Sequence, residues 1–242
     1  MSNTHYLRYE VLRTYRNRRF LIFSLIFPLI LFLVVAGPNR HARLIGVSFP
    51  LYYMSGMVAW GCMVAVISSG GRIAVERTVG WTRQLRITPL RTSAYFTAKI
   101  LCGYLMAILS MVVLYAAGTS VGVRLSAKEW LVMSGLVLVG LIPFAVLGVA
   151  MGHLLTPDSL GPALGGATSL LALLGGAYSP LVTSGVLFTL IKLLPSYWLV
   201  QAGRTAVGGG GWPLEGWLVV LGWSVVLSVA AVRIYRRDTR RI

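Results

Sequence analysis

Few residues in this sequence have types and spacings that could do chemistry. Only six of its 242 residues are acidic, and all are expected in loops, in tails or at the ends of apolar runs: Glu10, Glu76, Glu129, Asp158, Glu215 and Asp238. A proton-coupled carrier places a carboxylate inside the bilayer, so this distribution disfavours proton coupling through a buried acid. None of the lysines stands in the Gly-Lys-Ser/Thr context that holds nucleotide phosphates. The chain is therefore not expected to hydrolyse ATP by that route.

The histidines and cysteines form no constellation either. His5 and His41 are isolated, and His153, which could titrate, is expected to be a satisfied side chain at the end of an apolar run. Cys62 and Cys102 fall in separate apolar runs and are expected to be small core residues. We therefore expect no metal site and no catalytic dyad. The chain must form a pathway, a scaffold or a receptor that something else drives.

The composition indicates that these residues are held by membrane-spanning helices. The chain is 57% apolar and 12% charged, and its mean hydropathy is +0.78. A soluble domain has about 25% charged residues, and a spanning helix needs about 20 mostly apolar ones. Six apolar runs meet that need approximately, and the sequence thus predicts an all-α membrane protein with six transmembrane helices, at residues 20–36, 49–69, 95–123, 131–155, 160–178 and 216–232.

The stretch between the last two runs, residues 179–215, is apolar but broken by prolines and glycines. A piece such as 182–194 is too short to cross a bilayer, so a re-entrant or interfacial helical hairpin is expected there. The predicted organisation is thus an N-terminal segment (1–19), a transmembrane domain (20–232) and a basic tail (233–242).

Lysine and arginine predict the orientation. Sixteen of the 22 basic residues lie before the first span, between the second and third, or after the last. The positive-inside rule then places both termini in the cytoplasm. This basic side also suits anionic lipid headgroups. Because the charges flank apolar runs, they do not indicate binding to nucleic acid.

Two cytoplasmic segments could contact a partner. In the first, Leu7, Val11 and Tyr15 recur every four residues, which is typical of an amphipathic helix in the membrane interface; a solvated basic flank is the alternative. In the second, residues 72–91, Gly80 can end the helix that continues from the second span. Thr88 fits an N-cap and Pro89 the first position of the next helix. A stiff loop with apolar tips and one acid, Glu76, would suit a groove on a partner.

The residues of this loop also carry a family resemblance. Glu76-Arg77, Gly80, Leu85, Thr88-Pro89-Leu90 and Lys99 resemble the loop between the second and third spans of type 2 ATP-binding-cassette (ABC) export permeases, especially the daunorubicin-resistance and multidrug branch. The stretches 175–180 and 194–197, with Arg204, look like the segment after the fifth span of those permeases.

The resemblance implies a permease in the bacterial inner membrane that pairs with a second permease copy or a homologous permease. Each copy would dock a cytosolic ABC ATPase subunit, which would hold the ATP and magnesium, and this chain would bind no cofactor. The coupling residues would be Glu76, Arg77, Gly80, Leu85, Thr88, Pro89 and Leu90. Residues of an outer gate would be Pro180, Val182, Leu187, Phe188, Leu194 and Pro195.

The pathway residues are less sharply indicated. Ser68, Ser69, Thr168 and Ser169 place hydroxyls near apolar walls, although such hydroxyls often bond to a carbonyl four residues earlier. Since no acid is expected along the spans, a hydrophobic or amphipathic drug-like or lipid-like cargo fits best. The alternatives are a glycan or lipid-carrier exporter of the same family, and a membrane sensor or scaffold that transports nothing and docks a cytosolic partner.

Overall fold

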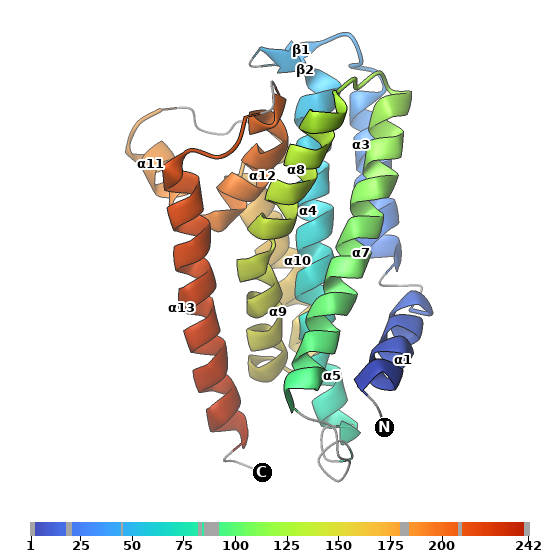
Figure 1. The fold of residues 1–242 in the computed structure, drawn as a ribbon, viewed down its shortest axis with the longest axis vertical. Helices are drawn as coiled ribbons and strands as arrows, with labels where there is room; N and C mark the ends of the chain where they lie inside the picture. Colours follow the sequence, from blue (N-terminus) through green and yellow to red (C-terminus); the bar gives the residue numbers. More distant parts are fainter. Residues whose placement is uncertain are drawn as a thin grey trace.

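A computed structural model shows a bundle of helices arranged around one central helix (Figure 1). It describes residues 3–17, 21–44, 46–81, 84, 92–179, 184–207 and 210–239. Helix α4 (Phe49–Gly71) is the centre, and 20 of its 23 residues are buried. It packs against α7 (Thr92–Ser120), α9 (Ile142–Leu154), α10 (Pro157–Leu174) and α12 (Pro195–Thr205). A helix that is apolar on all sides has to be buried in this way.

Glycines allow α4 and α9 to lie unusually close together. A Cβ atom on Gly148 would meet the backbone of Ile67 at 2.5 Å, and one on Gly70 would meet the backbone of Val149 at 2.4 Å. Small residues let two backbones approach in this manner inside membranes.

Four helical stretches are long and apolar enough to cross a membrane: Phe49–Thr78, Ser93–Ser120, Ala127–Leu154 and Leu214–Arg236. The second of these is α7, and the third joins α8 (Ala127–Gly140) and α9, with Pro143 at the start of α9. The last belongs to α13 (Leu214–Thr239), whose exposed side chains include Leu218, Leu221 and Val225. A fifth is obtained when α11 (Val186–Lys192) and α12, bent by 86° at their junction, are taken together.

The structure differs from the expected six spans at two of them. The first is shortened to a π-helical turn, η1 (Ile22–Ile26), followed by α3 (Phe27–Ala36). Pro28 lacks an amide hydrogen, and a π-turn before a proline relieves the backbone mismatch. The fifth is α10, whose glycines, proline and hydroxyl residues lower its hydropathy. By length and composition, therefore, the part of the chain that the structure describes supplies four spans, or five with the bent pair.

The expectation of an all-α protein needs one correction. Strands β1 (Arg43–Leu44) and β2 (Val47–Ser48) form a short antiparallel hairpin that pairs Arg43 with Ser48 and Leu44 with Val47. Gly46 in this turn has φ +78°, a conformation that glycine adopts without strain. The hairpin begins only seven residues after the end of α3, and two-residue strands leave no periodic signal in a sequence.

The two ends of the bundle are distinct. Figure 1 shows both termini, α1 (Asn3–Tyr15) and α5 (Ile73–Thr78) at the lower end and the β-hairpin at the upper end, with α11 and α12 also in the upper half. The described parts of α1, α5 and the C-terminal end of α13 thus lie at one end of the bundle.

Candidate functional site

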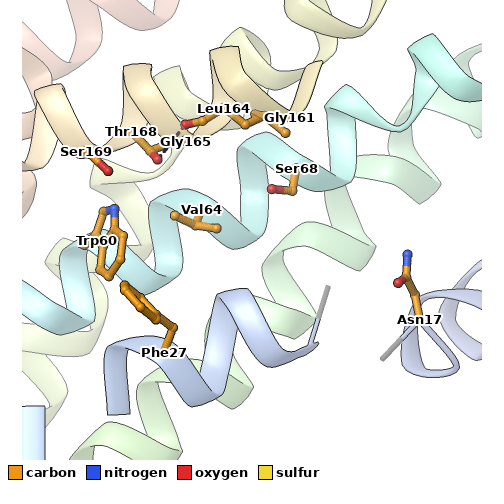
Figure 2. Close-up of a pocket in the computed structure, with 10 residues that line it drawn as sticks. All are labelled: Asn17, Phe27, Trp60, Val64, Ser68, Gly161, Leu164, Gly165, Thr168 and Ser169. Atoms are coloured by element: carbon orange, nitrogen blue, oxygen red, sulfur yellow. Dashed lines mark hydrogen bonds between the residues drawn. The ribbon is translucent and has the colours of Figure 1, made fainter. Parts of the chain in front are cut away.

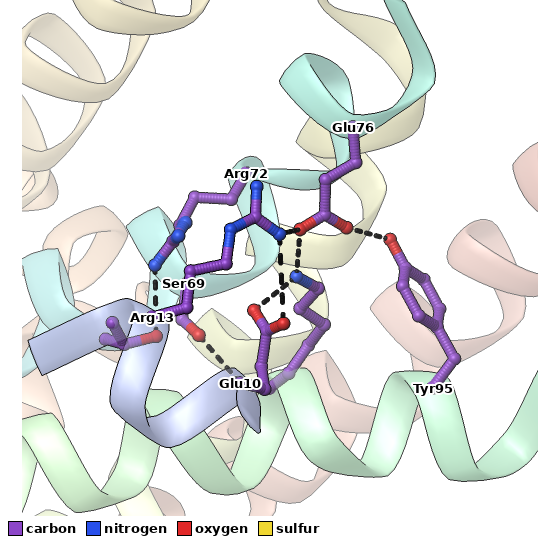
Figure 3. A network of polar contacts seen from close by, with 8 residues as sticks. Glu10, Arg13, Ser69, Arg72, Glu76 and Tyr95 are labelled. Carbon is purple, nitrogen blue, oxygen red and sulfur yellow. Dashed lines mark hydrogen bonds and ion pairs between the residues drawn. The ribbon is translucent and has the colours of Figure 1, made fainter. Parts of the chain in front are cut away.

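A cluster of charged side chains lies buried at the lower end of the bundle (Figure 3). The Lys99 ammonium on α7 donates to Glu10 on α1 and to Glu76 on α5, each at 2.5 Å. A guanidinium nitrogen of Arg13 lies 2.6 Å from the same oxygen of Glu76, and the Tyr95 hydroxyl donates to the other oxygen at 2.6 Å. We call Glu10, Arg13, Glu76, Tyr95 and Lys99 the buried charge cluster. It joins three segments that are far apart in the chain.

The N-terminal helix packs on the bundle through a stripe that adjoins the predicted interfacial stripe. Its buried residues are Tyr6, Glu10 and Thr14, which face α7, whereas Leu7 and Val11 are only partly buried. Polar side chains of this helix face inward because Glu10 pairs with Lys99 and Arg13 pairs with Glu76. Tyr15 belongs to the helix, but its side chain lies outside the described residues. Burial raises the pKa of the Tyr6 phenol, and the carboxylates of Glu10 and Glu76 add to this rise.

The cluster is balanced in charge. Two carboxylates, of Glu10 and Glu76, face two cations, Lys99 and Arg13, and the side chains of Lys99 and Glu76 are 0% exposed. A buried pair adds little net stability, but removing one partner leaves an uncompensated charge and costs about 3–5 kcal/mol. The cluster therefore fixes how the N-terminal helix sits on α5 and α7.

This geometry corrects the prediction for Glu76. We expected this acid to face a partner from the loop. Glu76 lies at the end of the Phe49–Thr78 stretch, and its side chain is buried, as is that of Glu10 on α1. In this conformation neither carboxylate is accessible to a partner.

Arg77 also points inward. It donates to the carbonyl oxygen of His153 at 2.5 Å and of Gly152 at 3.5 Å, at the end of α9. A cation is favourable at the C-terminus of a helix, where carbonyls have no helical partners. Arg77 thus ties α5 to α9, whereas Glu76 ties α5 to α1 and α7.

Gly80 has the role that the sequence predicted for it. It follows α5 with φ +73°, and it ends the helix that continues from α4. Directly after it, the Trp81 ring stacks on Tyr9 of the N-terminal helix with centroids 6.5 Å apart. The other coupling residues, Leu85, Thr88, Pro89 and Leu90, lie outside the described residues.

A cavity of about 630 Å³ lies between α4, α10 and the η1–α3 segment (Figure 2). None of its lining residues is charged; they are Asn17, Phe27, Trp60, Val64, Ser68, Gly161, Leu164, Gly165, Thr168 and Ser169. Three of the four predicted pathway residues, Ser68, Thr168 and Ser169, meet here. The fourth, Ser69, faces away and donates to the carbonyl oxygen of Lys99 at 2.7 Å. The Thr168 hydroxyl donates to the Leu164 carbonyl four residues earlier at 2.7 Å, as expected for such a residue.

Four of the predicted outer-gate residues lie in the described part of the chain, and they differ in their surroundings. Leu187 is 54% exposed, whereas Phe188 packs on Tyr197 with ring centroids 5.9 Å apart. Leu194 and Pro195 form the break that starts α12, and Pro195 is buried. Pro180 and Val182 lie outside the described residues.

Sequence reasoning missed Arg13, Tyr95 and Lys99 as partners of Glu76, and Glu10 as the second acid that bonds to Lys99. One signal was available: Lys99 is followed by a long apolar run, and a lysine there needs an acid on the same side of the membrane. Glu10 and Glu76 are two of the four acids that the charge distribution puts on that side, with Asp158 and Asp238. Trp60 was assigned to no pathway, and nothing in its local sequence distinguishes a cavity-lining tryptophan from an interfacial one.

Comparison with known proteins gives the family. Residues 4–207 match the family described as "ABC-2 type transporter". The chain is also 26% identical, over 239 residues that cover 95% of each chain, to the "Putative transport permease YvfS" of Bacillus subtilis (strain 168). The match extends from the N-terminal helix through α12, and so includes both the buried charge cluster and the cavity. The chain belongs to the ABC-2 type transporter family, whose members are the membrane permeases of ABC transporters.

Proposed function

We propose that this chain is the membrane subunit of an ATP-driven exporter that moves a hydrophobic or amphipathic, drug-like or lipid-like compound out of the cytoplasm. The observation that carries this proposal is the uncharged cavity between α4, α10 and the η1–α3 segment (Figure 2). A cavity with apolar walls and a few hydroxyls suits a ligand that is itself mostly apolar.

The energy would come from a separate cytosolic ABC ATPase that holds ATP and magnesium. Its docking site would be the loop at 72–91, with Leu85, Thr88, Pro89 and Leu90 on the contact surface. Glu76 and Arg77 would act from behind that surface. Because Glu76 bonds to α1 and α7 and Arg77 bonds to α9, a push on the loop would be transmitted to three helices together.

Several finer features belong to the same proposal. The chain would pair with a second permease copy, would cross a bacterial inner membrane six times with α3 and α10 as the additional spans, and would keep both termini in the cytoplasm. The 86° bend between α11 and α12 supports a re-entrant hairpin in the outer half. Leu187 and Phe188 on that hairpin would contribute to an outer gate.

ATP hydrolysis by the assembled complex tests this function without knowledge of the cargo. The permease and its ATPase subunit are purified together, reconstituted in proteoliposomes and assayed for phosphate release. We expect Leu85→Arg to abolish stimulation of the ATPase by the permease, because a charge is placed on the apolar docking surface. The matched control is Leu44→Arg in β1, at the opposite end of the molecule, which is expected to leave stimulation unchanged.

A complex in which Leu85→Arg stimulates the ATPase as well as the wild type does would contradict docking through this loop. A permease that copurifies with no ATPase, and that binds a sensor kinase, would show that the chain is a scaffold and transports nothing.

A further inference from the structure

A second depression lies beside the N-terminal helix at the lower end of the bundle. It has a volume of about 520 Å³ and is lined by Tyr9, Leu12, Arg13, Arg16, Asn17 and Arg72. We call it the arginine groove. Its apolar residues, Tyr9 and Leu12, are 51% and 53% exposed. The groove thus combines three guanidinium groups with two exposed apolar side chains.

The groove carries more positive charge than its surroundings compensate. Arg13 is held by Glu76 at 2.6 Å, and Lys99 with Arg13 balances the two buried carboxylates. Arg72 donates to the Thr14 hydroxyl at 3.0 Å. Within the described ranges, no carboxylate pairs with Arg72 or with the exposed Arg16. The groove thus has two guanidinium groups that no described carboxylate neutralises. An anionic ligand would supply the compensating negative charge.

The arginine groove lies next to the apolar cavity, and Asn17 lines both. Arg72 of the groove directly follows α4 and comes one helical turn after Ser68 of the cavity, and Trp60, which also lines the cavity, is eight residues before Ser68. At 1.5 Å per residue, the cavity wall from Ser68 to Trp60 is roughly 12 Å long. A basic groove therefore borders a long apolar space.

We propose that the groove and the cavity form one binding site for an amphipath with an acidic head, a phosphate or a carboxylate, and an apolar tail. The head lies against Arg16 and Arg72, which suit phosphate and carboxylate because a guanidinium donates two parallel hydrogen bonds to either group. The tail lies along Val64, Leu164 and Trp60. This inference rests on the proposed function in one respect: it makes such a molecule the class of cargo.

The two halves of the site exclude simpler ligands by different means. A free phosphate has no apolar part that could fill the cavity, and a neutral lipid has no net negative charge that the arginines could neutralise. Each can therefore be tested against the anionic amphipath with a single probe.

The probe is phosphatidylglycerol with a diazirine at the end of one acyl chain, and its reference is phosphatidylcholine with the same chain. The purified full-length permease, without any ATPase, is illuminated in nanodiscs that contain either probe, and labelled peptides are found by mass spectrometry. We expect phosphatidylglycerol to label the Trp60–Val64 and Leu164–Ser169 segments several-fold more than phosphatidylcholine does. An excess of inorganic phosphate is expected to leave that labelling unchanged.

Two variants test the head and the tail separately. Arg16→Glu changes an exposed side chain, and is expected to reduce the labelling by phosphatidylglycerol about fivefold or more, since one basic residue at a membrane surface has an effect of about that size. Its control is Arg8→Glu, another exposed residue of the same helix that does not line the groove. Gly165→Leu fills the cavity and is expected to reduce labelling by both probes. A Cβ atom at Gly165 meets nothing within 4 Å, and the same is true of the control Gly222→Leu on α13.

Equal labelling by the two lipids, or full labelling of the Arg16→Glu variant, would overturn the proposal, and loss of labelling in excess phosphate would assign the groove to free phosphate. These results do not depend on transport. If labelling fails while the complete complex still hydrolyses ATP under control of the 72–91 loop, the ligand class is wrong and the proposed function stands.

Discussion

Replacing Lys99 by methionine is predicted to destabilise this protein strongly, although methionine fits the volume of a lysine stem. The Lys99 ammonium lies 2.5 Å from a carboxylate oxygen of Glu10 and of Glu76. After the change, Glu76 keeps Arg13 at 2.6 Å and Tyr95. Glu10 keeps only Arg13, at 3.9 Å, among the described residues.

The magnitude follows from the burial of these groups. Removing one partner of a buried ion pair costs about 3–5 kcal/mol, because the remaining charge stays desolvated. For a chain of this size, about 1 kcal/mol corresponds to about 2–4 °C in melting temperature. The Lys99→Met protein is therefore expected to melt roughly 6–20 °C below the wild type.

The assay is thermal unfolding of the purified chain in detergent, followed by circular dichroism. Lys128→Met is the control, because Lys128 is exposed at the start of α8 and its loss is expected to change little. A second variant, Lys99→Met with Glu10→Gln, restores the balance of one carboxylate, Glu76, against one cation, Arg13. It is expected to melt above the single variant.

The reasoning would be refuted by a Lys99→Met protein that melts with the wild type. It would also be refuted if the double variant were no more stable than the single one, because the loss would then come from packing and not from an unpaired carboxylate.

Three further predictions concern the same bundle. Gly148→Ala should lower the melting temperature because its Cβ would meet the Ile67 backbone at 2.5 Å, whereas Gly135→Ala, with open space around it, should leave stability unchanged or raise it by about 0.5–1 kcal/mol. Tyr95→Phe should cost about 1.5–3 kcal/mol in unfolding free energy, since it removes a hydrogen bond to a buried carboxylate; an unchanged melt would contradict that bond. Ser126→Ala should cost about 1 kcal/mol by removing the capping box of α8, and loss of amide-exchange protection confined to the first turn of that helix would confirm the cause.

Local features of the chain were predictable from the sequence. The apolar runs at 49–69, 95–123, 131–155 and 216–232 each contain a helix, because twenty apolar residues leave no other way to satisfy the backbone in lipid. Gly80 ends a helix in the left-handed region, and Thr168 bonds to the carbonyl four residues earlier. Each of these depends only on neighbours within one turn.

The interior of the site was not predictable in the same way. The stripe Leu7, Val11 and Tyr15 predicts which face of the N-terminal helix lies on the membrane interface, but it does not predict that Tyr6, Glu10 and Thr14 are buried against the bundle. That face is set by Lys99 and Glu76, which are 89 and 66 residues away from Glu10 in the chain.

The sequence by itself thus determined that this is a multi-pass membrane protein and where four of its spans lie, because hydropathy acts residue by residue. Only the tertiary structure decided that Glu10 and Glu76 share Lys99, that Ser68 lines a cavity while Ser69 does not, and that the arginine groove lies next to that cavity. Those relations depend on how far each helix is rotated and shifted against its neighbours, and packing between distant segments sets both.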